Sequence, residues 1–337
     1  MRLLFPYAAT IAAMLLSAQA ASAGGLFPKV VVTVAPLKPY VDEILHGHGE
    51  AKNLLRPGQD AHRFALTLQQ AQMLDDADIV VVPDLAMSPF LQRLLSGRKN
   101  LRVVELSALN GAQPLPYARE NPWLARAKAA GKKPHDEHDA HDAHDEHEHD
   151  AATGNDPHLW LDPERMAALA PPLAAAIAAH APEARTALAA NAQQLAAHLR
   201  REVIPALREM LARPAATSSA VARPEIPFLT YHAAYQYFLT RFGLTHYGEI
   251  TQRPEESMGA KTMAGMLNTA TTLHVRCLIG EQKNVLMTSI AKSTGARLVI
   301  LSPEQTVARN AVDALDWMKN DYDRFLYATA KAFAECL

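Results

Sequence analysis

The sequence predicts an α/β protein built as two halves that are joined by a long helix. Short apolar runs alternate with helical patterns along residues 29–111 and again along residues 228–301. Strands that alternate with helices form parallel sheets with helices packed on their faces. Between the two series, residues 163–213 are rich in alanine, the strongest helix former. We therefore expect one sheet in each half and a helical region between them.

The elements of the first half follow from the spacing of its apolar residues. Consecutive β-branched and apolar residues predict strands, and apolar residues at helical spacing predict helices. We expect strands at 30–34, 53–55, 79–82 and 103–106, and helices at 38–45, 67–76 and 89–96.

The linking region is expected to contain the longest helix of the chain. Pro171 and Pro172 interrupt the alanine-rich stretch, and Pro182 stands where a proline is tolerated, in the first turn of a new helix. A helix over residues 182–212 would be roughly 45 Å long at 1.5 Å per residue. Pro205 should kink it, because proline lacks the N–H that the helix needs.

The second half repeats the alternation of strand and helix. Its strands are expected at 228–231, 245–250, 275–279 and 297–301, and its helices at 233–242, 259–272, 283–293 and 312–336. This places Cys277 on a central strand and Cys336 at the end of the last helix. They are the only cysteines, an even number, and a disulfide between them is the first expectation for an exported protein. Two reduced buried thiols are the alternative.

The N-terminus carries the features of an export signal. Residues 1–23 combine a basic start, a short apolar run and a small-x-small site ending at Ala23. We expect a cleaved signal peptide, and the absence of a cysteine near the site argues against a lipoprotein. The predicted location is the periplasm. With 33 basic and 35 acidic residues, the charge balance gives no support to nucleic acid or anionic membranes as partners.

A histidine- and acid-rich run interrupts the chain between the predicted halves. Its six histidines alternate with carboxylates, and they are His135, His138, His141, His144, His147 and His149. Imidazole binds zinc, copper and nickel, and the carboxylates attract cations. Since alanine is its only apolar residue, residues 133–153 are expected to form a flexible, solvated loop that collects metal. A charged insertion without function is the alternative.

Three other histidines lie at the ends of predicted strands or loops, just before the next element begins. They are His62 in RPGQDAHRF, His158 in NDPHLWLDPE and His232 in FLTYHAAYQYF. Ligands gather at the carboxyl ends of parallel strands, and three imidazoles with a fourth group make a tetrahedral zinc site. Each could instead be a capping or core histidine. The remaining histidines are expected on surface or helix faces or at a helix end, and they are His46, His48, His180, His198, His246 and His274.

Taken together, these segments resemble the zinc-binding periplasmic solute-binding proteins of bacterial ABC transporters. The resemblance covers nearly the whole chain after the signal peptide. It is carried, in order, by VVTVAPLKPYVDEI, RPGQDAHRFALTLQQAQMLDDADIVVV, NDPHLWLDPE, FLTYHAAYQYFLTRFGL, RCLIGEQKN and the terminal AFAEC, with the histidine-rich run just before the second histidine segment.

The resemblance implies two Rossmann-like lobes, a rigid backbone helix and a metal cleft between the lobes. It also implies that His62, His158 and His232 are the metal ligands and that Zn²⁺ is the transported ligand. A histidine at position 232 favours zinc, because manganese-binding relatives usually have a carboxylate there. Imidazole suits zinc, whereas oxygen-rich sites suit manganese.

The sequence departs from the family pattern at the fourth ligand. Ser302 stands where many relatives have aspartate, and Ala61 stands where some zinc-binding members have glutamate. Water is the first expectation for the fourth ligand. Glu281, Glu304, Asp60 or a histidine of the run are the alternatives.

The expected function is capture of Zn²⁺ in the periplasm and its delivery to the membrane permease of an ABC importer, by a protein that is a monomer and not an enzyme. A binding protein for manganese or another divalent metal, and a zinc chaperone or buffer, are the alternatives. A zinc hydrolase with Glu281 as general base is a remote one, because the chain has no H-E-x-x-H motif, nucleophile elbow or phosphate loop. The expected domains are 24–162, 163–213 and 214–337.

Overall fold

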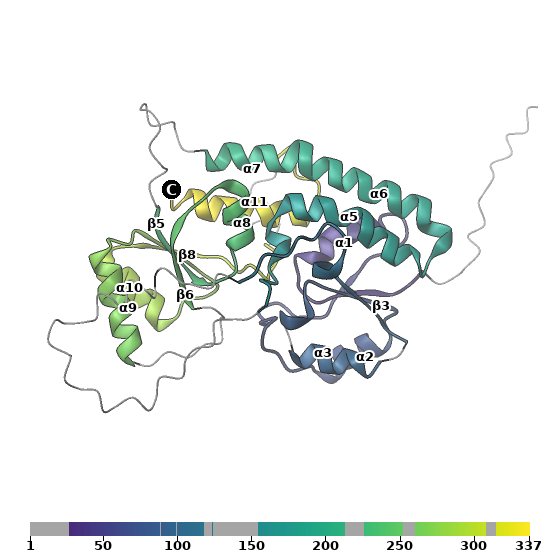
Figure 1. Ribbon diagram of the computed structural model, residues 1–337, viewed down its shortest axis with the longest axis horizontal. Coiled ribbons are helices and arrows are strands. Elements are labelled where there is room, and N and C mark those ends of the chain that lie inside the picture. Colours follow the sequence, from purple (N-terminus) through teal and green to yellow (C-terminus); the bar gives the residue numbers. More distant parts are fainter. Residues whose placement is uncertain are drawn as a thin grey trace, which may run out of the picture.

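The computed structural model describes two α/β lobes beneath a long helical ridge (Figure 1). It describes residues 27–87, 89–98, 100–117, 123, 154–212, 226–251, 260–307 and 315–337. The predicted signal peptide, 1–23, and the histidine-rich run, with His135, His138, His141, His144, His147 and His149, lie outside the described residues.

The first lobe is a four-stranded parallel sheet with helices on its faces. The strands are β1 (Val30–Val32), β2 (Lys52–Asn53), β3 (Ile79–Val82) and β4 (Arg102–Glu105), in the order β2-β1-β3-β4. The helices are α1 (Leu37–Leu45), α2 (Leu68–Asp75) and α3 (Pro89–Ser96), with 3₁₀ turns at η1 (Leu85–Met87) and η2 (Leu106–Ala108). Every residue of β1 and β3 is buried, as expected for strands covered on both faces.

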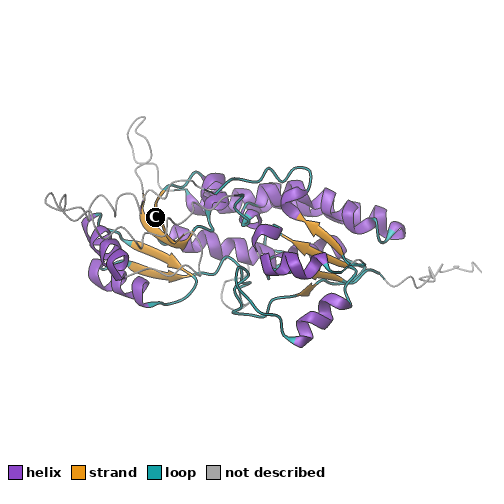
Figure 2. Ribbon diagram, turned by 60° about the horizontal axis from the view of Figure 1, so that its bottom comes forward, coloured by secondary structure: helices purple, strands orange, loops and turns teal. Residues whose placement is uncertain are grey.

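The second lobe has the same strand order. Its parallel strands are β5 (Ile226–His232), β6 (His246–Thr251), β7 (Cys277–Gly280) and β8 (Arg297–Ile300), in the order β6-β5-β7-β8. Its helices are α8 (Gln236–Phe242), α9 (Ala260–Thr272), α10 (Val285–Thr294) and α11 (Asp321–Ala334). Figure 2 shows the strands of each lobe grouped among helices. The two predicted α/β halves are therefore confirmed, and they share one topology.

The linking helices run across both lobes. They are α5 (Pro163–Ala178), the 3₁₀ turn η4 (Pro182–Ala184), α6 (Arg185–His198), the π-helical turn η5 (Leu199–Val203) and α7 (Ile204–Leu211). The predicted long helix is present, and α6 to α7 form the ridge in Figure 1. The irregularity expected at Pro205 takes the form of the π turn just before it, in which the Ile204 N–H bonds to the Leu199 carbonyl. Helix α5 continues through Pro171 and Pro172.

One hydrophobic cluster connects the lobes and the linking helices. It includes Val32 of the first sheet, Leu173 of α5 and Phe333 of α11. Helix α11 contacts both α1 and α7, so the end of the chain packs against the first lobe as well as the ridge. Within the described part of the chain, no helix combines the length and the apolar character needed to cross a membrane.

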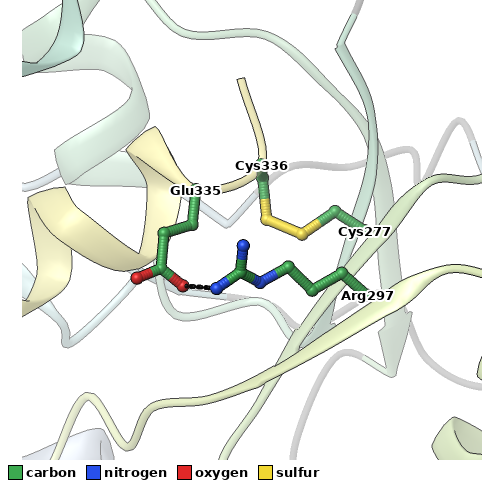
Figure 3. Close-up of a disulfide and its surroundings, with 4 residues drawn as sticks. All are labelled: Cys277, Arg297, Glu335 and Cys336. Atoms are coloured by element: carbon green, nitrogen blue, oxygen red, sulfur yellow. Dashed lines mark hydrogen bonds and ion pairs between the residues drawn. A yellow bond between two sulfur atoms is a disulfide. The ribbon is translucent and has the colours of Figure 1, made fainter.

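The disulfide joins the end of the chain to the second sheet (Figure 3). Cys277 lies on the interior strand β7 and Cys336 lies just after α11, with their Cα atoms 5.4 Å apart. Beside it, Arg297 of β8 pairs with Glu335 at 2.5 Å. The predicted disulfide is confirmed.

Candidate metal centre

Four side chains from four separate segments converge between the lobes. His62 lies in the loop between β2 and α2, and Glu304 lies in the loop after β8. His232 is the last residue of β5, and His158 precedes the 3₁₀ turn η3 (Leu159–Leu161) that leads into α5. Three of the four segments thus leave the carboxyl ends of parallel strands, where ligands of such sheets are expected.

Three distances within this group match the edges of a tetrahedron around zinc. One ligand atom from each side chain can be chosen so that all four lie within 4.8 Å of one another. The Nε2 atom of His158 lies 3.3 Å from that of His62 and 3.4 Å from that of His232. The Nε2 atom of His62 lies 3.4 Å from Oε1 of Glu304. Ligands at about 2.0–2.1 Å from a tetrahedral zinc are separated by roughly 3.3 Å.

Two of the histidines are oriented by carboxylates on their other ring nitrogen. Nδ1 of His158 lies 2.7 Å from Oδ1 of Asp156, which also accepts the His158 main-chain N–H at 2.9 Å. Nδ1 of His232 lies 2.7 Å from Oε1 of Glu281. A carboxylate on Nδ1 keeps the proton there and directs the lone pair of Nε2 toward the centre of the group.

The carboxylate of Glu304 is held by the first lobe. Its Oε2 accepts the main-chain N–H of Ala61 at 2.7 Å, while its Oε1 faces His62. Both positions at which the sequence departs from the family pattern contact Glu304, because its own N–H donates to the hydroxyl of Ser302 at 3.3 Å.

The other candidates for a fourth ligand have different partners. Glu281 is bonded to the far nitrogen of His232, and Asp60 accepts the main-chain N–H of His62 at 2.7 Å. Of the three carboxylates considered from sequence, only Glu304 joins the described group, and the histidines of the run lie outside the described residues. Water was the first expectation, and the geometry favours Glu304 in its place.

The group is almost completely excluded from solvent. His158 is 0% exposed, His232 1% and Glu304 6%, and the side chain of His62 is 4% exposed. Uncompensated charges are costly in such a place, so the group is suited to sharing protons or to holding a cation.

Burial and mutual charge shift the pKa values of these groups in different directions. Burial lowers the pKa of His158, and the neighbouring His232 lowers it further. Burial acts the same way on His232, but the nearby carboxylates, above all Glu281, outweigh it and raise that pKa to about 9. Burial raises the pKa of Glu304 to about 7, against the effect of the Ala61 N–H. A metal ion that binds here has to displace protons.

Sequence reasoning missed two features around buried histidines. Asp156, which is 0% exposed and holds His158, could have been found from its position two residues before the histidine. His198 was expected on a surface or helix face. It lies on α6 but is buried, with Nε2 at 2.8 Å from Oδ2 of Asp323 in α11. That partner is far away in the chain, so no local pattern indicated it.

The family follows from the whole chain. The sequence profile of ZnuA, zinc-uptake complex component A, periplasmic, matches residues 30–334. The chain belongs to this family. A ZnuA relative from Brucella abortus (strain 2308), named a high-affinity zinc uptake system protein, is 26% identical over 323 residues, which cover 91% of this chain and 91% of the relative.

Solved structures share the fold. A crystal structure of ZnuA has a TM-score of 0.66 and 21% identity, over 92% of this chain and 98% of that one. The solute-binding protein FpvC of Pseudomonas aeruginosa, solved in complex with Mn²⁺, has a TM-score of 0.65 and 18% identity, over 92% of this chain and 97% of its own. These likenesses show the fold alone, because the identities are low.

This ZnuA-family chain is therefore a periplasmic binding protein for zinc uptake, and it is not an enzyme. The alternative of a zinc hydrolase is removed. Membership in an uptake complex also decides against a chaperone or buffer that works alone.

Proposed function

We propose that His62, His158, His232 and Glu304 hold one Zn²⁺ ion as cargo. The observation that carries this proposal is the convergence of four ligand atoms within 4.8 Å of one another, three of whose distances, 3.3–3.4 Å, equal the edges of a tetrahedral zinc site. With Glu304 as the fourth ligand, the site needs no water to complete it. The burial of the group supports it, because the positive charge of the ion would compensate the carboxylates that surround the histidines.

The choice of metal follows from the donor atoms. Three imidazoles and one carboxylate suit zinc, whereas manganese prefers oxygen ligands. The carboxylates on Nδ1 of His158 and His232 make these ligands more basic and fix their orientation. We therefore propose zinc as the preferred cargo over manganese.

Release requires the ligand set to be separated. His62 belongs to the first lobe, whereas His232 and Glu304 belong to the second. A small opening of the lobes would remove at least one ligand from the ion. In the proposed cycle the loaded protein docks on the membrane permease of an ABC importer, and the opening of the lobes transfers zinc to it.

The parts outside the described residues complete the proposed cycle. The histidine-rich run would collect zinc weakly and pass it to the four-ligand site, and residues 1–23 would direct export and then be removed. We propose that the protein acts as a monomer.

We also propose domains at 24–162, 163–213 and 214–337. These bounds agree with a first sheet that ends at Glu105 and a second sheet that begins at Ile226. Trp123, however, packs in the cluster of the second lobe.

Zinc titration by calorimetry, with competition by a chelator, tests the ligand assignment. The protein without residues 135–150 is compared with the same protein carrying His62→Ala, His158→Ala and His232→Ala. His180→Ala serves as the control, because His180 is an exposed histidine outside the group. One tight site in the first protein and the control, and none in the triple variant, is the expected result. Equal binding in all three would overturn the assignment.

Glu304→Gln tests the fourth ligand separately. Glutamine keeps the size of the side chain but removes the charge, so zinc affinity should fall while one site remains. Glu183→Gln, at an exposed glutamate, is the control. If Glu304→Gln binds zinc as the wild type does, water or another group completes the site.

A further inference from the structure

The side chain of Gln305 bridges the two lobes next to the metal centre. Gln305 follows Glu304 in the loop after β8. Its side-chain amide both accepts a hydrogen bond from, and donates one to, main-chain atoms of the first lobe. Its Oε1 accepts the N–H of Gly58 at 3.3 Å, and its Nε2 donates to the carbonyl of Gln59 at 3.2 Å. These two bonds, the Gln305 bridge, span the same gap as the contact between Glu304 and His62.

The loop that receives the bridge is held in shape by its own lobe. Oε1 of Gln59 accepts the N–H of Arg56 at 2.8 Å and Nε2 of Gln70 at 2.7 Å. Gln70 is 2% exposed and forms a capping box with Thr67 at the start of α2. The main chain at Gly58 and Gln59 is therefore tied to a helix end and offers a fixed target.

The bridge and the ligands must move together. Gln59 is three residues before His62, and Gln305 is adjacent to Glu304. Any opening that takes His62 away from Glu304 also separates Gly58 and Gln59 from Gln305. The free energy of both hydrogen bonds therefore adds to the barrier that opening has to cross.

We propose that Gln305 is a positioning residue that holds the lobes closed over the cargo and sets the rate at which the metal leaves. This inference rests on the proposed binding of zinc by His62, His158, His232 and Glu304. Gln305 does not contribute an atom to that group. Its removal should change the rate of opening and leave the ligand set as it is.

The size of the effect follows from two partly exposed hydrogen bonds. Without them zinc should leave about tenfold faster, a factor that corresponds to about 1.4 kcal/mol. Gln305→Met is the informative variant, because methionine fills the same space without the amide. Gln282→Met is the matched control: Gln282 is an exposed glutamine in another loop of the second lobe, beside Glu281.

Stopped-flow mixing of the zinc-loaded full chain with excess chelator measures the release rate. Gln305→Met should release zinc about tenfold faster than the wild type, and Gln282→Met at the wild-type rate. The absorption spectrum of bound Co²⁺ should be the same in all three, which shows that the ligands are intact. Hydrogen exchange at Gly58 should be faster in Gln305→Met alone.

The outcomes separate the bridge from the site. If the wild type releases zinc slowly and both variants release it at the wild-type rate, the proposed role of the bridge is wrong and the proposed function still stands. A changed Co²⁺ spectrum in Gln305→Met would also overturn it, because Gln305 would then act on the ligand geometry. Absence of a tight zinc site in the wild type would overturn the proposed function, and the bridge with it.

Discussion

His158 and His198 are both buried histidines paired with an aspartate, yet only His158 lies in the candidate metal centre. The histidine–carboxylate distances are nearly equal, 2.7 Å to Asp156 and 2.8 Å to Asp323. The difference lies in the second ring nitrogen. That of His158 faces two other imidazoles, whereas Nδ1 of His198 lies 3.4 Å from a carboxylate oxygen of Glu202.

The second nitrogen decides what each pair can do. At His158, burial and the nearby His232 lower the pKa, which favours the neutral imidazole that a metal requires. At His198, burial acts in the same direction, but Asp323 outweighs it and the pKa is raised. His198 therefore favours the charged form and serves as an ion pair between α6 and α11. A buried histidine with a carboxylate indicates a metal site only when its free nitrogen converges with other ligands.

The largest expected difference between the two histidines is in zinc affinity. His158→Ala removes one of four proposed ligands. A quarter of the binding free energy of a structural zinc site corresponds to a loss of about 100- to 1,000-fold. His198→Ala should leave the affinity unchanged. Competition titration against a chelator measures both, and an equal loss in the two variants would refute the distinction.

The two aspartates that pair with these histidines, Asp156 and Asp323, should differ in the same way, with a smaller effect on zinc affinity. Asp156→Asn leaves His158 in place but removes the charge behind it, and loss of such a partner typically costs 10- to 100-fold in metal affinity. Asp323→Asn should have no effect on zinc. The same titration tests this pair, and an unaltered affinity in Asp156→Asn would mean that Asp156 only shapes the loop.

Acid should weaken zinc binding at the metal centre but strengthen the ion pair between His198 and Asp323. Because the pKa of His232 is raised to about 9 in the absence of a cation, zinc competes with a proton at neutral pH. The affinity should fall by up to about tenfold for each pH unit between pH 9 and pH 7, and more steeply below pH 7, where Glu304 is protonated as well. Calorimetry in buffers of different ionisation enthalpy should detect release of about one to two protons near pH 7. No proton release would contradict the raised pKa.

The smallest expected effect is on the stability of the His198 pair. The folded pKa of His198 is raised, so its stabilising contribution is complete below the unfolded value of about 6.5 and disappears as the pH rises through the folded value. His198→Gln should lower the free energy of unfolding of the metal-free protein by about 1–2 kcal/mol at pH 6, and by less at pH 9. Urea unfolding at the two pH values measures this. A loss that grows with pH would show that the sign is wrong.

Much of the fold could be predicted because apolar patterning is local. The strand Ile79–Val82 and the helix Pro89–Ser96 have the predicted bounds. The last helix was predicted over 312–336 but begins at Asp321, where Asn320 and Asp323 form a capping box. That signal is present in the sequence and was overlooked. The shared strand order of the lobes could not be predicted, because it depends on pairing between distant segments.

The sequence by itself predicted the α/β class, the family, the disulfide and the three histidines proposed as metal ligands, because each prediction rests on residue types and their order along the chain. Only the tertiary structure brought Glu304, one of the candidates for the fourth ligand, next to the three histidines and separated His158 from His198. The positions of Glu304 beside Ala61, of Gln305 across from Gly58 and of Asp323 beneath His198 arise from the packing of segments more than a hundred residues apart. Such contacts depend on how lobes and helices meet in space, which no local spacing of residues expresses.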